Sequence, residues 1–224
     1  MAKRIIFRVD KKGIYEELIE FKYYLGFSIF QKQRSIESLH KEIEKLFSGK
    51  ILDISSKSPL KLGQKLSAFN LKVKLNEKYI SLENVFQSSK VFEYGGPYLD
   101  LIDVSPMEAK KDERIRSSGK IVSFRLNGRD FPINPQTLFY DWIYCRALSH
   151  YPEYVNELLR YSIFSDIEFN HEKSINCQAR SIAIFVYLVI NGYIEIALKN
   201  IDSFSKYAYE KFYKYEKIKT LLDL

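Results

Sequence analysis

The sequence has 224 residues, 46% of them hydrophobic, and its 17 Tyr and 16 Phe can bury enough surface for a single folded domain, which excludes a disordered chain. Lys and Arg outnumber Asp and Glu by 35 − 28 = 7, and this basic balance favours a polyanionic partner such as nucleic acid. The two cysteines form no pair motif, the three histidines are scattered, and no apolar run is long enough to cross a bilayer. We therefore expect a cytoplasmic protein with reduced thiols and with no metal, cofactor or membrane contact.

Residues 1–48 are predicted to form a helical N-terminal extension. The segment IYEELIEFKYYL has the apolar spacing of a helix, and Gly26 separates it from a second predicted helix, SIESLHKEIEKLF. Ser35 and Ser38 are both candidate N-caps for that second helix, and Gly49 is its expected stop. A short strand, KILDIS, and a polar loop rich in serine follow.

Two β-hairpins are predicted in the middle of the chain. LKVKL and YISL flank a turn that begins at Asn76, and they lead directly into a helix over residues 82–92. KIVSFRL and RDFPI flank Asn127 and Gly128, the pair that a type I′ turn favours.

The remaining segments are predicted to be helical. Ser105 and Glu108 form a capping box at the start of one helix, and Pro135 and Pro152 each precede another. A further helix is expected over residues 179–190. The sum is a mainly α protein with two small β-hairpins, in the α+β class. We divide it into the extension at 1–48, a central domain at 49–205 and a basic, Tyr- and Lys-rich C-terminal helix at 206–224.

The stretch SLENVFQSSKVF carries a polar stripe. Glu83, Gln87 and Lys90 follow one another at i, i+4 and i+7, which places them on one side of the predicted helix, opposite an apolar arc. Such a stripe is usually a solvated helix face. Helical side chains lean toward the N-terminus, however, so a long Lys90 side chain can reach back toward Glu83. The two charged tips would then meet around one bound group.

The order of segments around this stripe resembles the NADAR family of N-glycosidases. The family pattern is matched by ILDISSKS, KLSAFN, the first hairpin and then SLENVFQSSKVF. The capped SPMEAKK helix, the aromatic YDWIYCRAL helix and the stretch from DIEFN to INCQAR follow in the family's order. The resemblance spans roughly residues 50–190 and is most specific at Glu83, Phe86, Gln87 and Lys90.

The chain is most similar to the branch of DarT-associated NADAR antitoxins, on the strings ISSKS, LSAFN, FQSSKVFE and SINCQAR. This resemblance implies an enzyme that removes ADP-ribose from guanine in DNA, with RNA left open as a substrate. It also implies a partner, a cognate DarT-type toxin encoded nearby. Two features differ from the wider family: Asn84 stands where a His is frequent, and a Trp-Gly pair near the late carboxylate is absent.

The implied chemistry assigns candidate catalytic roles. Cleavage at an anomeric carbon develops positive charge on the sugar, which Glu83 would stabilise. Lys90 has two candidate roles: as a cation it would bind the diphosphate, and as a neutral amine it would attack the sugar and form a Schiff base. The second role needs a lowered pKa, which burial favours and an ionised Glu83 opposes. We favour the nucleophile and add Gln87, from the same stripe, to the catalytic set.

Candidate binding residues come from the loops. The hydroxyl-rich loop after KILDIS suits phosphate contacts or is an ordinary turn, and the Gly-Gly-Pro-Tyr segment suits backbone approach and base stacking or simply ends the helix. The late acidic and amide side chains suit recognition of ribose or base, and the arginine suits phosphates or a nearby acid. The predicted substrate-binding residues are Ser55, Ser56, Lys57, Asn70, Asn84, Gly96, Tyr98, Asp103, Asp166, Glu168, Asn176 and Arg180.

Two alternatives remain open at this stage. The same chemistry would suit a small phosphorylated ribosyl-amine of the riboflavin-pathway type, and a non-catalytic antitoxin would bind its toxin or coat DNA. Cations outside the predicted core are either solvated or follow a DNA backbone, with aromatic side chains available for stacking. These cations are Lys3, Arg4, Lys11, Lys12, Lys32 and Arg34.

Overall fold

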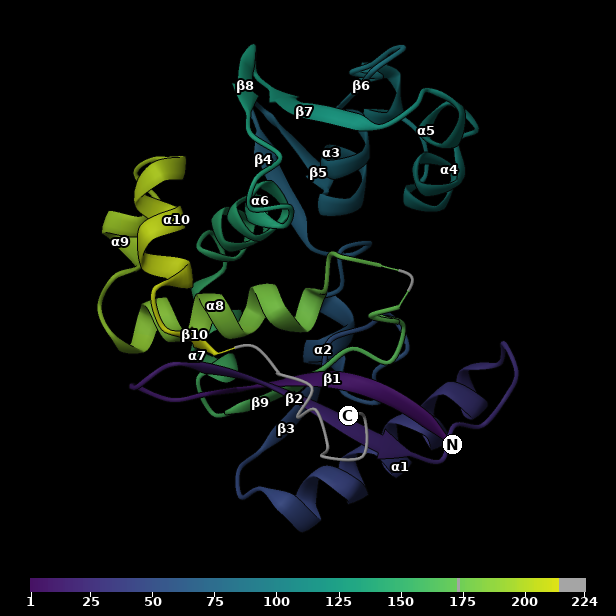
Figure 1. The fold of residues 1–224 in the computed structure, drawn as a ribbon, viewed down its shortest axis with the longest axis vertical. Helices are drawn as coiled ribbons and strands as arrows, with labels where there is room; N and C mark the ends of the chain where they lie inside the picture. The colour runs from purple at the N-terminus through teal and green to yellow at the C-terminus, as the bar shows by residue number, and fades with distance from the viewer. Residues whose placement is uncertain (173, 214–224) are drawn as a thin grey trace, which may run out of the picture.

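A five-stranded sheet forms the base of the molecule in the computed structural model, which describes residues 1–172 and 174–213 (Figure 1). Its strand order is β10-β2-β1-β9-β3, with bounds Phe212–Tyr213, Ile14–Phe21, Ala2–Val9, Ile163–Ser165 and Ile51–Asp53. β1 runs antiparallel to β2 and β9, whereas β3 is parallel to β9 and β10 is parallel to β2. Strands from both ends of the chain therefore share one sheet.

The prediction of a helix over IYEELIEFKYYL is wrong. Ile14–Phe21 is a strand that pairs with β1 over its whole length, from Ala2 opposite Phe21 to Val9 opposite Ile14. The apolar residues of this segment fit both the helical repeat and the alternation of a strand, and the segment is a strand because it pairs with β1. With 42% of residues in helices and 21% in strands, the protein is α+β, and the expectation of a mainly α fold is not confirmed.

Helices cover both faces of this sheet (Figure 1). Successive residues of β1 face opposite sides: Ile6 packs with α1, which spans Ile29–Leu46, whereas Phe7 joins the larger core under α8, which spans Gln178–Ile190. α1 begins earlier than predicted, because Ser28 is its N-cap and accepts a hydrogen bond from the Gln31 backbone N–H. Ser35, expected to be a cap, is buried inside the helix.

Both predicted hairpins are confirmed. β4 (Lys72–Leu75) pairs with β5 (Lys78–Ser81), and β7 (Ile121–Leu126) pairs with β8 (Arg129–Phe131). Asn127 and Gly128 have φ of 49° and 74°, the left-handed values that a type I′ turn requires. A strand that was not predicted, β6 (Lys90–Phe92), extends the second hairpin by pairing with β7.

The other helices are short. The capping box of Ser105 and Glu108 is present at α4, as predicted. The predicted C-terminal helix is wrong in part, since α10 ends at Tyr209 and β10 follows, while residues 214–224 lie outside the described residues. The remaining elements are α2 (Lys61–Lys65), α3 (Leu82–Ser88), η1 (Leu99–Ile102), α4 (Pro106–Lys111), α5 (Arg114–Ser117), α6 (Leu138–Leu148), α7 (Pro152–Leu158), α9 (Ile194–Ala197) and α10 (Ile201–Tyr209).

Both cysteines are buried as free thiols, as predicted. Within the described residues, no helix combines the length and the apolar character that a membrane span needs.

The packing of β1 against α1 generates a stability prediction. Ile6 is fully buried between the two elements, so Ile6→Ala leaves a cavity and is expected to lower the free energy of unfolding by about 2–5 kcal/mol. Leu46→Ala is the matched control on α1, because Leu46 is 63% exposed, and its effect should stay within about 0.5 kcal/mol. Urea denaturation of both variants measures this. Equal effects would show that residues 1–48 are not part of the core.

Candidate functional site

A cavity of about 760 Å³ lies beside α3 and collects most of the predicted site residues. Its walls come from the loops after β3 and β9, the segment between α2 and β4, and helices α3, α4 and α6. We call it the α3 cavity. The predicted residues that line it are Ser56, Lys57, Asn70, Glu83, Gln87, Lys90, Asp166, Glu168 and Asn176.

The helix that carries the polar stripe is shorter than predicted. α3 ends at Ser88, and Lys90 is the first residue of β6, opposite Phe124 of β7. The hydroxyl groups of Ser88 and Ser89 both donate to the Val85 carbonyl oxygen. This acceptor at the end of the helix is thereby hydrogen-bonded to side chains. Lys90 is therefore not two turns along the same helix as Glu83; its side chain returns to the helix from a strand.

Gln87 connects the acid to the amine. Its Nε2 donates to Glu83 Oε1 at 2.8 Å, and its Oε1 accepts from Lys90 Nζ at 2.7 Å. All three side chains are buried, with exposed fractions of 6% for Glu83, 5% for Gln87 and 8% for Lys90. The tips of Glu83 and Lys90 thus converge inside the cavity, as the spacing predicted, but through the amide of Gln87.

The environment of Lys90 raises the neutral fraction of its amine. Burial lowers the pKa of Lys90 to about 8; the charge of Glu83 opposes this shift, and that of Lys110 adds to it. The Lys90 ammonium lies 4.6 Å from the centre of the Phe86 ring. A pKa near 8 leaves a substantial neutral fraction close to neutral pH, which an exposed lysine does not have.

Asp166 is a second buried acid in the cavity. It accepts hydrogen bonds from Gln178 Nε2 at 2.8 Å and from the Glu168 backbone N–H at 3.0 Å. Burial nevertheless raises the pKa of Asp166 to about 6. Gln178 also accepts from the Ala68 backbone N–H at 2.6 Å and so ties two walls of the cavity together. Asp166 can therefore hold a proton close to neutral pH.

Asp53, which the sequence analysis missed, lies behind Asp166. It accepts from Ser55 Oγ at 2.6 Å, and from Ser165 Oγ and the Ile167 backbone N–H at 3.0 Å each. Burial, and then the charge of Asp166, raise the pKa of Asp53 to about 7. The only sign of this role in the sequence is that Asp53 ends the strand β3, two residues before Ser55 of the serine loop.

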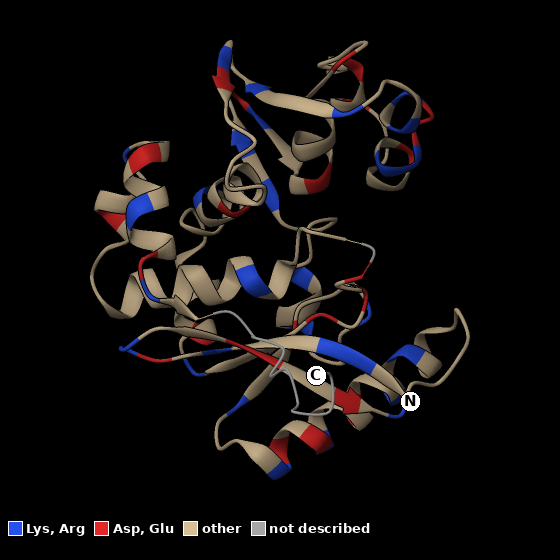
Figure 2. Ribbon diagram, in the orientation of Figure 1, with Lys and Arg blue, Asp and Glu red and all other residues tan. Residues whose placement is uncertain are grey.

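Cations other than Lys90 also line the cavity. Lys110, Lys111 and Arg116 come from α4 and α5, where Figure 2 shows basic residues, and Lys57 comes from the loop after β3. Lys110 Nζ lies 5.3 Å from the centre of the Phe69 ring. The cations of α4 and α5 were not predicted to line the site, because basic residues near a helix C-terminus have an ordinary role there. Together these cations suit the phosphates of an anionic ligand.

Tyr140 of α6 is another lining residue that was not predicted. It is fully enclosed, and burial followed by the charge of Glu83 raises the pKa of its hydroxyl well above the ordinary value. Tyr140 packs edge-on against Phe86, with ring centres 4.9 Å apart, and thereby forms an aromatic wall beside Glu83.

Three predicted binding residues have structural contacts instead of lining the cavity. Ser55 donates to Asp53 inside the protein. Asn84 Nδ2 donates to the carbonyl oxygens of Leu101 and Val104, at 2.7 and 2.9 Å, and so holds the loop that leads to α4. Arg180 lies 3.5 Å from Asp141 and over the Phe212 ring, which joins α8 to α6 and β10.

The remaining three also lie outside the cavity lining: Gly96 and Tyr98 are half-buried near β6, and Asp103 is exposed near β5. Tyr98 bonds Ser118 and lies under the guanidinium of Arg114, 4.5 Å from its ring centre. Asp103 is exposed and lies 3.7 Å from Lys78. Gly96 has φ +78°, and a Cβ there would lie 2.5 Å from the Lys90 carbonyl oxygen. Its role is thus to let the chain pass close to the backbone of Lys90.

A second cavity, of about 490 Å³, lies on the other side of α6. It is lined by Trp142, Phe131 and Arg146 among others, and its carboxylate, Asp130, is bound by Arg125. It contains no buried acid and amine, so we assign the chemistry to the α3 cavity.

This α+β domain brings a buried acid, a buried amine and several cations into one cavity, an arrangement that suits an anionic ligand. The profile of DarT1-associated NADAR antitoxins matches residues 2–218, nearly the whole chain, and the chain belongs to that family. The resemblance stated from the sequence is thus confirmed, and the family supports an antitoxin role in association with a DarT1 toxin. A search of curated proteins gives no match.

The buried position of Asp53 predicts how stability depends on pH. Its carboxyl titrates near 7 when folded and near its ordinary 3.8 when unfolded, so the folded state binds more protons between these values. The free energy of unfolding should therefore fall as pH rises from about 4 to about 7, by about 1.4 kcal/mol for each pH unit in this range. Asp53→Asn should flatten this fall, leaving the part that Asp166 contributes.

Urea denaturation at pH 4.5, 6 and 8 measures this dependence. The control is Asp103→Asn, at an exposed carboxyl, which should keep the wild-type slope. A slope that is the same in Asp53→Asn and in the wild type would contradict a raised pKa for Asp53.

Proposed function

We propose that the protein hydrolyses the N-glycosidic bond between ADP-ribose and guanine in DNA, and so reverses the mark written by a DarT-type toxin. The observation that carries this proposal is the buried hydrogen-bonded chain of Glu83, Gln87 and Lys90 in a cavity rimmed by cations. The α3 cavity, at about 760 Å³, is within the range of small-molecule sites, and ADP-ribose combines a diphosphate with two riboses.

The lining residues of the cavity suit the two parts of this ligand. Glu83 can stabilise the positive charge that develops on the ribose as the bond to the base breaks. The cations of Lys57, Lys110 and Arg116 can neutralise the diphosphate. The enclosed position of Glu83 strengthens its electrostatic effect, because the low-dielectric surroundings screen it weakly.

Lys90 acts as the nucleophile in this proposal. Its neutral Nζ forms a bond to the sugar carbon while the bond from that carbon to the guanine nitrogen breaks, and Asp166 gives its proton to the leaving nitrogen. Glu83 takes the proton that the attacking amine loses. The ribose ring then opens to a Schiff base as the ring oxygen takes the remaining amine proton, and water hydrolyses this Schiff base, releasing ADP-ribose and restoring the free amine. Glu83 gives its proton to solvent and Asp166 takes one up, which restores both acids. One water is consumed for each bond cleaved.

Glu83→Gln and Lys90→Ala are expected to lower ADP-ribose release from guanine-ADP-ribosylated DNA by at least about 100-fold while both variants stay folded. The measurement is chromatography of released ADP-ribose, with thymine-ADP-ribosylated DNA as a second substrate that should not be cleaved. Lys61→Ala, at an exposed residue of α2, is the control and should keep full activity.

Three results would contradict this proposal. Release from neither DNA would exclude the substrate, and cleavage of a phosphorylated ribosyl-amine alone would favour a metabolic enzyme. Protection of cells by Glu83→Gln against the toxin, at the wild-type level, would favour a non-catalytic antitoxin.

A Schiff base can be trapped. Cyanoborohydride added during turnover should reduce it to a stable adduct of ADP-ribose on Lys90, which mass spectrometry of peptides locates. Because this step needs a neutral Lys90, with a pKa of about 8, and a protonated Asp166, with a pKa of about 6, the rate of adduct formation should rise about tenfold per pH unit below pH 6, stay level between pH 6 and 8, and fall above pH 8. Lys90→Arg should give no adduct. Release of ADP-ribose without an adduct would assign Lys90 to diphosphate binding instead.

A further inference from the structure

The connection between β2 and α1 exposes large apolar side chains to solvent. Phe27 is 100% exposed, Leu25 85%, Phe30 67% and Ile29 55%. Most aromatic and aliphatic residues of this chain are buried, so four exposed ones within six positions form an unusual patch. We call residues 25–30 the β2–α1 patch.

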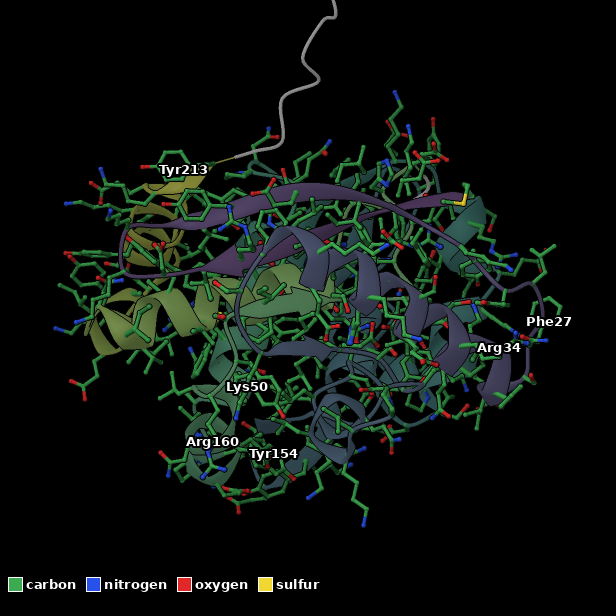
Figure 3. The ribbon with its side chains drawn as sticks, turned by 90° about the horizontal axis from the view of Figure 1, so that it is seen from below. Phe27, Arg34, Lys50, Tyr154, Arg160 and Tyr213 are labelled. Carbon is green, nitrogen blue, oxygen red and sulfur yellow. The ribbon has the colours of Figure 1, made fainter. Side chains whose placement is uncertain are left out.

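Cations accompany the patch. Arg34 lies over the Tyr24 ring at 4.0 Å and within 5.7 Å of the Phe30 ring, and Lys22 lies 5.2 Å from the Tyr24 ring. The first turn of α1 contains no acidic residue. Figure 3 shows Phe27 and Arg34 at the same edge of the molecule. Exposed rings beside cations provide stacking faces for bases together with charge for phosphates.

A polar contact fixes the patch relative to the α3 cavity. Lys32, one turn into α1, donates to the Tyr23 hydroxyl at 2.7 Å and lies 3.1 Å from Glu168, which lines the cavity. His40 of α1 lies 3.1 Å from Ser165 of β9, directly before Asp166. Through Lys32, the helix that carries Ile29 and Phe30 of the patch contacts the cavity wall.

We propose that the β2–α1 patch is a stacking wedge for nucleic acid, which holds the bases beside the modified guanine while that guanine occupies the α3 cavity. This inference rests on the proposed function and extends it from the ADP-ribose to the strand that carries it. A base that is taken out of a stack leaves its neighbours exposed, and apolar side chains inserted there replace the lost stacking. The cations at Lys22 and Arg34 match the phosphates on either side.

The test compares binding of a fluorescent, unmodified single-stranded DNA of 15 nucleotides by the full chain and by the double variant Phe27→Ala, Phe30→Ala. Fluorescence anisotropy should show binding weakened by about 10- to 100-fold. Leu46→Ala removes an exposed apolar side chain from the other end of α1 and should stay within about twofold of the wild type. Equal binding by all three proteins, or no binding by the wild type, would overturn the wedge.

A second measurement separates this inference from the proposed reaction. On an ADP-ribosylated oligonucleotide the double variant should lose about 10- to 100-fold in kcat/KM, while on ADP-ribosylated deoxyguanosine, which has no neighbouring bases, it should match the wild type within about twofold. If the double variant releases ADP-ribose from the oligonucleotide as fast as the wild type does, the wedge is overturned and the proposed reaction stands. If the double variant binds DNA more weakly than the wild type but neither protein releases ADP-ribose, the wedge stands and the proposed reaction is overturned.

Loss of association with the cognate toxin in the double variant, with DNA binding unchanged, would identify the patch as a protein-docking surface and would also overturn the wedge.

Discussion

The arrangement of the α3 cavity depends on one amide side chain, that of Gln87. A buried acid and a buried amine each cost free energy unless polar partners replace the water that they lose. Gln87 serves both, since its NH₂ group donates to Glu83 and its oxygen accepts from Lys90. Direct contact between the two charges would hold the proton on the amine more firmly. The interposed amide separates them, so burial is able to lower the pKa of Lys90 despite the opposing charge of Glu83.

This arrangement in turn requires the chain to change from helix to strand within two residues. The serine hydroxyls at the end of α3 occupy the Val85 carbonyl oxygen, and the Arg125 backbone N–H then donates to the Ser89 carbonyl oxygen at 2.7 Å. Pairing with β7 fixes the backbone of Lys90, and the close passage of Gly96 packs against its carbonyl oxygen. The lysine therefore approaches Gln87 from a rigid strand rather than from a flexible helix end, which limits the positions that its amine can take.

Local signals in the sequence predicted the parts of the fold that local interactions determine. The capping box at Ser105 and the type I′ turn at Asn127 are examples, because each needs only residues that are close along the chain. The strand β2 was missed because its partners are β1 and, from the far end of the chain, β10. The site shows the same division. Helical spacing predicted that Glu83 and Gln87 would share one side of α3, whereas Lys90 reaches Gln87 from β6, a strand that was not predicted. Lys110 lines the cavity, and Asp53 lies behind Asp166, only through tertiary packing. Arg180 lies outside the cavity because it pairs with Asp141 of a neighbouring helix.

The cations of this chain fall into two groups that favour different parts of a ligand. Lys57, Lys110 and Arg116 concentrate charge at the α3 cavity, which is what a diphosphate needs. Outside this cavity, Lys22 and Arg34 lie over the half-buried Tyr24 ring, and Arg34 also lies 5.7 Å from the exposed Phe30 ring. Lys32, on the same helix as Arg34, pairs with Glu168, and through this pair α1 contacts the cavity wall. The N-terminal segment thus has two roles that are coupled: β1 and α1 bury part of the core, and the same packing places an exposed surface next to the reactive centre.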